Sequence, residues 1–381
     1  MANEIIIQIL NTSKNPIGII DTAKSIIWHN VYFGCGDFEI YCEATEKHLT
    51  LLKKDYYVTR NGTNDVGIIE SINVTFDLEN GYMIVASGRF IKSILDRRLI
   101  FYIEADNSHT NNATILSGKV EVAARKLVYD NAINDRGGDS NRNIPDLVLG
   151  QLKDFPKIIV DENGNPAQKQ VSYQNLLEYT DELLHEYGYG AKVTINESNK
   201  NFLYTVYTGT DRSTDNTGGN EPVIFSIEYD NLYSSDYLYN QKPYKNAALI
   251  GGEGKGLDRF YSYMTQNEAG LQLREIFVDA SSINRKYKDD NEEEQEYTEA
   301  EYTTMLNQQG KKTLLEHIIE QKFNGNIVVD FGKWQLNRDY FIGDIVTIQD
   351  NLLNIYINER ITETTEVQDD SGYSVDVVFG Q

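Results

Sequence analysis

The spacing of hydrophobic and polar residues changes along the chain between the period of a strand and the period of a helix. Over the first 88 residues, apolar and β-branched residues mostly alternate with polar ones, with Gly and Asn between the runs, as in FEIYCEAT and VGIIESINVTFDL. Alternation over about four to eight residues is typical of strands with one buried face. The first quarter of the chain is therefore predicted to be mostly β-structure.

Helical spacing follows these strands. GRFIKSILDRRLI (88–100) predicts a short helix just after its first glycine, and residues 114–133 predict a second helix. PDLVLGQL (145–152) is expected to be a short turn or helix. VSYQNLLEYTDELLHEYG (171–188) gives the clearest helical pattern, and Gly188 supplies a stop signal at its end.

Strand-like segments return after this helix, as in AKVTIN, FLYTVYTG and LQLREIFVDA. Among them, DRSTDNTGGNEP (211–222) predicts a polar hairpin tip. The acidic run KYKDDNEEEQEY (286–297) predicts a mobile, exposed loop. A helix should then begin at Thr298, because Glu301 three residues later completes a capping box. Strands close the chain, so the predicted order is β, α, β, α, β.

Three segments near the start of the chain have counterparts at its end. Each triplet holds a basic-Asp-Tyr-aromatic-aliphatic strand, an apolar strand with Glu near its end, and a Gly-Tyr hairpin. Either an internal duplication or the common composition of β-hairpins explains this similarity. A duplication predicts two small barrels with matching strand order in each chain. Three such chains in a ring would then present six similar surfaces. The segments are KKDYYV (53–58), VGIIESI (66–72) and NGYMIVASG (80–88), then NRDYFI (337–342), IYINERI (355–361) and SGYSVDVVFG (371–380).

The patterns together predict an α+β protein that is mainly β, with two small β-barrel domains in tandem and with α/β and helical insertions. The second barrel is expected to be discontinuous in sequence. The predicted parts are a first barrel at 1–105, an α/β insertion at 106–200, a second barrel at 201–280 and 326–381, and an acidic loop with a helical insertion at 281–325.

The charge balance narrows the range of partners. The chain carries 58 acidic and 35 basic residues, a net charge of −23. This balance argues against sequence-specific or phosphate-neutralising nucleic acid binding. MANEIIIQIL lacks the basic and apolar regions of a leader, and the longest apolar runs span about four residues, so no membrane insertion is expected. Cys35 and Cys42 fit neither a disulfide framework nor a zinc site, and are predicted to be free thiols.

Candidate chemistry is sparse. GGEGKG (251–256) lacks the Ser or Thr of a phosphate-binding loop, and DENGNP (161–166) has Pro where a calcium loop needs Gly, so both are predicted to be turns. The five histidines form no HExxH motif. We therefore expect no catalytic, cofactor-binding or metal-binding residues, no cofactor and no enzymatic activity. The histidines are His29, His48, His109, His185 and His317.

Four segments carry a resemblance to a known family. DYFIGDIVTIQD, INERITETTEV, GRFIKSILDRRLI and LIGGEGKGLDRF resemble segments of the baseplate hub proteins of tailed bacteriophages, also called tail-associated proteins, and of their relatives in contractile injection systems. Many relatives continue into a cell-wall-cleaving or fibrous region, so with the sequence stopping at Gln381 we expect such an activity on another polypeptide. The matching positions are Phe341, Gly343, Asp344 and Val346, then Arg360, Ile361 and Glu363, and the hairpin Gly251–Arg259.

The resemblance implies a function in a phage tail. It predicts a structural homotrimer that forms a hub ring, closes the hexameric tail tube and anchors a central spike or fibre. Implied partners are the tail tube or distal tail protein and a spike, fibre or tape-measure protein. The implied location is the virion or a prophage-encoded tail-like particle, after synthesis in the bacterial cytoplasm. Two alternatives stay open: a carbohydrate- or receptor-binding tail protein, suggested by 26 tyrosines and the segment 228–244, and a cell-wall-degrading hydrolase.

Overall fold

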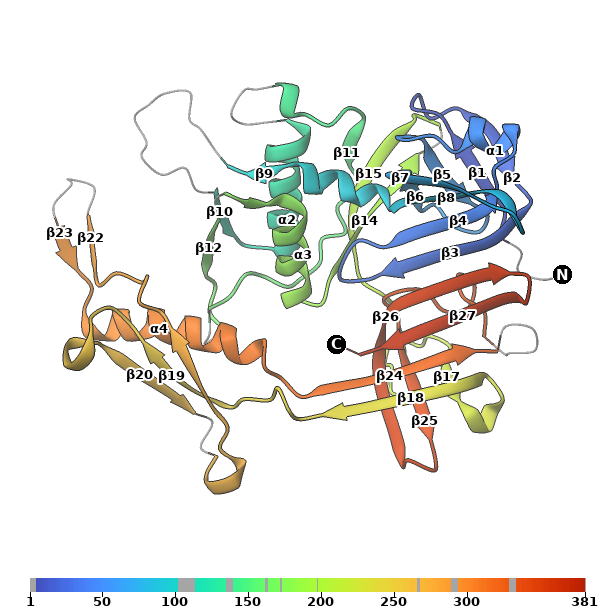
Figure 1. Ribbon diagram of the computed structural model, residues 1–381. Coiled ribbons are helices and arrows are strands. Elements are labelled where there is room, and N and C mark those ends of the chain that lie inside the picture. Colours follow the sequence, from blue (N-terminus) through green and yellow to red (C-terminus); the bar gives the residue numbers. More distant parts are fainter. Residues whose placement is uncertain are drawn as a thin grey trace. The chain divides into compact units, whose positions relative to one another are not determined.

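The computed structural model describes most of the chain, and within that part strands predominate over helices (Figure 1). The chain divides into two compact units. The main unit combines Met1–Asp236 with Phe323–Gln381, and the inserted unit is Tyr237–Lys322. The described residues are 5–101, 114–134, 140–161, 164–171, 173–196, 198–265, 268–288, 294–328 and 334–380.

One large sheet organises the main unit. Its strands follow the order β18-β24-β27-β26-β3-β4-β8-β7, and three further strands, β16, β17 and β25, attach through β26. The bounds are β3 Ala23–Val31, β4 Asp37–Glu43, β7 Ser71–Asp77, β8 Gly81–Arg89, β16 Asp211–Arg212, β17 Ile224–Ser226, β18 Leu232–Asn240, β24 Glu320–Ile327, β25 Ile345–Asp350, β26 Ile355–Asp369 and β27 Gly372–Phe379.

The same four-strand order occurs twice in this sheet. In β3-β4-β8-β7 and in β18-β24-β27-β26, a hairpin inserts its second strand between its first strand and an earlier strand of the chain. Both hairpins turn at the Gly-Tyr sequences: Asp77 pairs with Gly81, and Asp369 pairs with Gly372. The matching strand order predicted from the sequence is therefore observed.

Closed barrels, in contrast, do not occur in the described residues. The path of paired strands begins at β18 and ends at β7 without returning. The physical reason is the length of β26. This strand has 15 residues and extends beyond the part that pairs with β25. Its second half pairs antiparallel with β3, from Glu363 opposite Val31 to Asp369 opposite Ser25. The two repeats thus join edge to edge in one sheet, where two separate barrels were expected.

A second, smaller sheet packs near the first repeat. Its order is β2-β1-β5-β6. Trp28 lies in the shared core, with ring centroids 5.9 Å from Phe38 and 4.9 Å from Phe90. Burial of large aromatic side chains is a major source of stability in such cores. The bounds are β1 Ile7–Leu10, β2 Pro16–Ile20, β5 Tyr57–Arg60 and β6 Val66–Ile68, with the short helix α1 Glu46–Leu51 after β4.

The helical part of the main unit packs α2 and α3 against each other and against the three-stranded sheet β11-β15-β14. The Gly188 stop is confirmed, with φ +70° just after α3. The bounds are η1 Ile91–Arg97, β9 Leu99–Ile100, β10 Thr114–Ser117, α2 Val120–Val128, η2 Tyr129–Ile133, η3 Ser140–Arg142, β11 Leu147–Leu149, β12 Gln168–Val171, β13 Gln174–Asn175, α3 Leu176–Glu186, β14 Gly190–Asn196 and β15 Asn201–Tyr207.

Four local predictions are wrong. Residues 114–117 form a strand, because Gly118 at φ +73° separates them from the helix. Residues 147–149 form a strand that pairs with β15, where a turn or helix was expected. DRSTDNTGGNEP was expected to be a hairpin tip. Instead, β16 and β17 both pair parallel with successive parts of β25, so most of this segment is a loop that interrupts a single strand. DYFI (339–342) lies in turns before β25, whereas a strand was expected.

The inserted unit packs helix α4 on a three-stranded sheet of order β20-β19-β21. The capping box is confirmed, because the Thr298 side chain accepts from the Glu301 amide and the Glu301 side chain accepts from the Thr298 amide. The ends of the acidic run pair as β22 and β23, and residues 289–293 lie outside the described part. The bounds are η4 Ile227–Tyr229 before the unit, then β19 Ala247–Gly251, η5 Gly256–Asp258, β20 Tyr261–Thr265, η6 Gly270–Gln272, β21 Glu275–Asp279, β22 Lys286–Lys288, β23 Glu294–Glu296 and α4 Glu299–Leu315.

No helix in the described ranges combines the length and the apolar character needed to cross a membrane.

Candidate functional site

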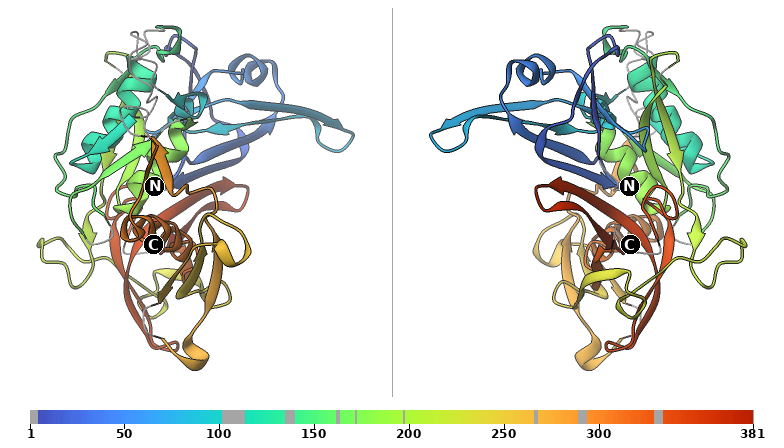
Figure 2. Two further views of the ribbon diagram at one scale, coloured as in Figure 1. Left: turned by 90° about the vertical axis from the view of Figure 1, so that its left-hand side faces the viewer. Right: turned by 90° about the vertical axis from the view of Figure 1, so that its right-hand side faces the viewer.

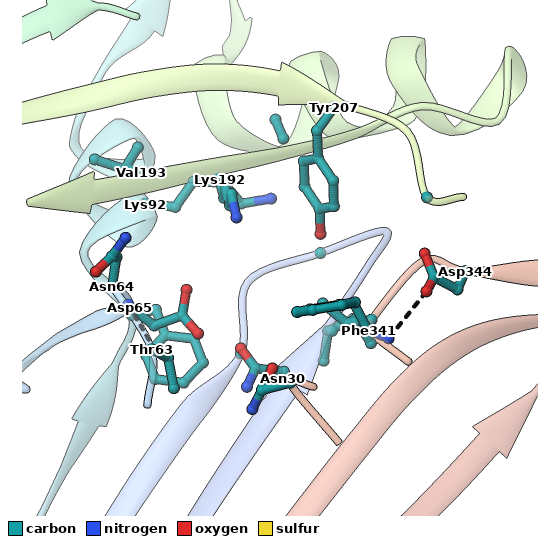
Figure 3. Close-up of a pocket in the computed structure, with 18 of the residues that line it drawn as sticks. Asn30, Thr63, Asn64, Asp65, Lys92, Lys192, Val193, Tyr207, Phe341 and Asp344 are labelled. Carbon is teal, nitrogen blue, oxygen red and sulfur yellow. Dashed lines mark hydrogen bonds between the residues drawn. The ribbon is translucent and has the colours of Figure 1, made fainter. Parts of the chain in front are cut away.

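A cavity of about 410 Å³ opens in the main unit where six segments of the chain meet (Figure 3). It is lined by the end of β3 and the turn after it, the turn between β5 and β6 (62–65), residues 90–92, the start of β14, the end of β15 with residues 208–212, and residues 337–344. Its volume falls within the usual range for ligand pockets. The lining is mixed, with apolar side chains such as Phe341 beside polar ones such as Asn30 and Asn64.

Lys92, one of the residues that line this cavity, forms a buried ion pair. Its Nζ lies 2.8 Å and 2.9 Å from the two carboxylate oxygens of Asp181, and only 4% of the lysine side chain is exposed. The neighbouring Cys35 thiol donates to the carbonyl of Phe90. Burial raises the pKa of Cys35 to about 11, so the thiol stays protonated at neutral pH and is a poor nucleophile. The lysine joins η1 to α3 and is not available as a free cation.

Asp344 holds the opposite wall together. Its carboxylate accepts from the amides of Thr210 (2.7 Å) and Phe341 (3.0 Å) and from Nε of Arg212 (2.9 Å). Burial raises the pKa of Asp344, while these donors act in the opposite direction. The residue therefore pins β25 to the segment before β16. This positioning role accounts for Asp344 in the motif of Phe341, Gly343, Asp344 and Val346.

In the cavity lining Arg212 pairs with Asp344, and the lining contains no histidine. Within the residues described, no group of three His, Cys, Asp or Glu side chains is placed to hold a metal ion. The Tyr207 ring is partly buried with its centroid 5.2 Å from that of Tyr32, and burial raises its pKa well above the usual value. The geometry is that of a junction between segments and offers no nucleophile paired with a base.

The sequence motifs that suggested ligands lie elsewhere. GGEGKG connects β19 to β20, and Arg259 folds back to donate to the carbonyls of Gly251 (2.9 Å) and Gly252 (3.1 Å). Carbonyls turned toward a cation are the reverse of a phosphate cradle, whose amides point at the anion. In DENGNP, Asp161 accepts from the amide of Asn165 (2.8 Å) in a turn, and residues 162 and 163 lie outside the described part.

The four histidines with described positions each have a separate partner. His109 lies outside the described residues. The contacts are His29 with the carboxylates of Asp37 and Glu363, His48 with the carbonyl of Glu43, His185 with the ring of Phe33, and His317 with the carbonyl of Thr313.

The most unusual surface feature is the β7–β8 hairpin. All seven side chains of β7 are exposed, and in the described chain this strand pairs only with β8. Phe76 is 56%, Leu78 97% and Tyr82 63% exposed. Figure 2 shows this hairpin, in light blue, extending from the first repeat of the large sheet. An exposed edge strand with apolar side chains is a template for pairing with another chain.

A second apolar tip connects β25 to β26. There Leu352 is 92% and Tyr356 55% exposed. The sequence predicted the β7–β8 hairpin from its Gly-Tyr turn but not the exposure of these apolar side chains, because their alternation was taken as a sign of one buried face. The strand signal itself was correct. The tyrosines that motivated the carbohydrate alternative are also partly exposed, at 55% for Tyr229 and 83% for Tyr233.

Comparisons with solved structures show where this fold occurs. A 43 kDa tail protein of prophage MuSo2 from Shewanella oneidensis is 13% identical, with a TM-score of 0.57 over 100% of this chain and 98% of that chain. A tail protein from Neisseria meningitidis is 12% identical, with a TM-score of 0.57 over 99% and 96%. A Francisella PdpA-VgrG complex is 11% identical, with a TM-score of 0.50 over 99% of this chain and 58% of that chain. At these identities the likeness shows a shared fold.

A search of curated protein sequences found no match. The family comparison is decisive, because the model described as Siphovirus ReqiPepy6 Gp37-like protein matches residues 6–381. The resemblance inferred from the sequence is thereby confirmed for family and fold. The chain belongs to the siphovirus ReqiPepy6 Gp37-like family.

Proposed function

We propose that this protein is a structural, non-enzymatic component of a phage tail tip or baseplate, where three copies form a hub ring that closes the hexameric tail tube. The observation that carries the proposal is the repeated strand order in the large sheet. Two similar four-strand modules per chain supply six similar modules per trimer. A threefold assembly then meets a sixfold tube with nearly equivalent contacts.

The free edges of the sheet suggest how copies join. Inside one chain the two repeats meet where β26 pairs with β3. When the two repeats are compared strand by strand, β7 of the first corresponds to β26 of the second, and β3 of the first corresponds to β18 of the second. Pairing β7 of one copy with β18 of the next would reproduce the internal junction between chains. Such a head-to-tail contact uses two different surfaces and closes into a ring.

The remaining parts of the proposal concern partners and location. The family and the fold shared with prophage tail proteins support a place in the virion or a tail-like particle. A hub in this position contacts the tail tube or distal tail protein on one side and a spike, fibre or tape-measure protein on the other. The ion pairs of Lys92 with Asp181 and of Arg212 with Asp344 hold segments of the cavity wall in place, which supports a structural role.

Replacing Val74 in the middle of β7 by proline tests the ring. Proline removes a backbone donor and is poorly tolerated in a paired strand. The Val74 side chain is 44% exposed, so its loss removes little packing, and because Val74 also lies opposite Ile84 of β8 the fold of the proline variant is checked separately. Val74→Thr is the matched control, because it keeps the strand and the donor. We expect light scattering to show a trimer for the native chain and for Val74→Thr, and a monomer for Val74→Pro.

A complementation assay tests the proposal even where the trimer forms only during tail assembly. In a strain that produces the particles but lacks this gene, Val74→Thr should enter purified tails and Val74→Pro should not. Circular dichroism of the purified variants checks that both are folded. Incorporation of Val74→Pro at the native level would refute pairing through β7.

A further inference from the structure

The inserted unit leaves one face of its sheet uncovered. Helix α4 covers the other face, where a small aliphatic core forms. On the open face, Leu249, Tyr261, Tyr263 and Phe277 are exposed by 39%, 49%, 47% and 51%. A sheet with one solvated face ordinarily presents polar residues there. A gathering of large apolar side chains on such a face marks a binding surface.

The strand register places these side chains in a row. Leu249 on the central strand β19 lies opposite Tyr263 on β20 and opposite Phe277 on β21. The row therefore crosses the whole sheet, and its two aromatic residues lie two strands apart, roughly 10 Å. That separation is comparable to the span of two linked pyranose rings.

Arg259 fixes the second row of the same face. Its guanidinium lies against Gly251, where a Cβ would come within 2.7 Å of it. The guanidinium carbon is 5.9 Å from the ring centroid of Tyr261 and 5.4 Å from that of Phe277, and the group pairs with Asp279 at 2.5 Å. Both rings are thus held by a cation that is itself anchored, so little side-chain entropy is lost when a ligand binds.

Carboxylates border the rows of apolar side chains. Tyr263 donates its hydroxyl to Glu275 at 3.0 Å, and the Asp279 side chain is 61% exposed. An ionised carboxylate has about four acceptor positions, so each retains capacity for a further donor. The face therefore suits a ligand that is apolar on its flat side and carries hydroxyl donors around its edge.

The size and charge of the open face indicate which class of ligand it can bind. Three strands about 4.8 Å apart, each five residues at about 3.3 Å, cover roughly 250 Å². A stable protein–protein interface needs about 800 Å² from each partner, so neither a second copy nor another protein fits this face alone. The net charge of −23 and the bordering carboxylates disfavour polyanions.

We propose that the open face of the β20-β19-β21 sheet binds a neutral oligosaccharide. The row of Tyr263, Leu249 and Phe277 stacks against the sugar rings, and Glu275 and Asp279 accept from their hydroxyls. This activity lies beyond the structural role proposed above and does not depend on it. The tyrosines of segment 228–244, which suggested carbohydrate binding at the level of sequence, are not part of this face.

Calorimetric titration of the full chain with cellohexaose and with chitohexaose tests the proposal. The native chain should bind at least one of them in the millimolar range or tighter. Tyr263→Ala and Phe277→Ala should each weaken binding about tenfold, which corresponds to roughly 1.4 kcal/mol. Phe76→Ala is the matched control, because that phenylalanine is similarly exposed but lies on β7. It should bind as the native chain does.

Two further variants protect the test against misfolding. Tyr263→Phe keeps the ring and should retain most of the affinity, whereas Leu249→Glu places a charge in the middle of the row and should abolish binding. Absence of binding by both hexasaccharides, or unchanged affinity in Phe277→Ala and Leu249→Glu, would overturn the proposal. A change of molecular mass in light scattering caused by these variants, without loss of sugar binding, would assign the face to a protein partner instead.

Discussion

The ion pair between Arg60 on β5 and Glu366 on β26 ties the small N-terminal sheet to the C-terminal strands. The two side chains are in direct contact, and only 7% and 2% of them are exposed. The arginine guanidinium lies 5.7 Å from the ring centroid of Trp28, and Tyr373 donates its hydroxyl to Glu366 at 2.5 Å. Removing the arginine charge therefore leaves a buried carboxylate with one neutral donor.

Arg60→Met keeps most of the aliphatic stem and removes only the charged group. Leaving one member of a buried pair without its partner costs about 3–5 kcal/mol. Loss of the contact with Trp28 adds about 0.5–1 kcal/mol. We therefore expect the free energy of unfolding to fall by about 3.5–6 kcal/mol at neutral pH. Adding Glu366→Gln should recover about half of this loss, because the unpaired charge is then gone.

The same variant has a predictable dependence on pH. Burial raises the pKa of Glu366, and the charge of Arg60 opposes that rise. Without Arg60 the folded pKa rises further above the unfolded value of about 4.5, so the folded state binds the proton more tightly than the unfolded state. The cost of the buried charge is present above the folded pKa and is relieved as pH falls through it. The loss caused by Arg60→Met should thus be smaller at about pH 5 than at about pH 7.

Urea unfolding followed by tryptophan fluorescence measures these differences. Lys47→Met is the matched control, because Lys47 and its partner Asp21 are each about half exposed. This control should leave the unfolding midpoint unchanged. A loss below about 1 kcal/mol for Arg60→Met, or an equal loss at both pH values, would refute the reasoning about the buried pair.

Three further variants or reactions test other parts of the fold. Gly343→Ala should lower the thermal stability by more than about 2 kcal/mol, because φ is +91° and the new Cβ would lie 2.4 Å from the Tyr32 ring; an unchanged melting temperature would contradict this. Thr298→Ala should destabilise α4 by about 1 kcal/mol in hydrogen exchange, while Thr298→Ser should not. Cys35 has a pKa of about 11, so iodoacetamide should label it slowly at about pH 8 and faster as pH rises; rapid labelling of the folded chain at about pH 8 would exclude this.

Local signals explain which elements the sequence predicts correctly. The capping box at Thr298 and the stop at Gly188 depend only on neighbours within a few residues, and both are observed. Residues 147–149 were misread because their strand identity comes from pairing with β15, more than 50 residues away. The short apolar run alone does not distinguish a strand from a helical turn.

Long-range pairing also explains the missing barrels. The hairpins that end β7 and β26 were recognisable from their Gly-Tyr turns, and their similarity correctly indicated a repeat. Residues 25–31 pair with residues 363–369, but neither sequence contains a signal that indicates this pairing. For the same reason the cavity was not foreseen, because its walls come from segments up to 300 residues apart, each with ordinary composition.

The inserted unit begins and ends on neighbouring strands. The chain leaves the main unit along β18 and returns along β24, and these strands are adjacent in the large sheet, where a Cβ on Gly325 would touch Leu232. A short turn between them would therefore close the main unit as a simple hairpin. The inserted unit is a cassette that recombination can delete, enlarge or exchange without disturbing the sheet. A lineage can thus change the sequence and size of this unit while the strand order of the large sheet stays the same.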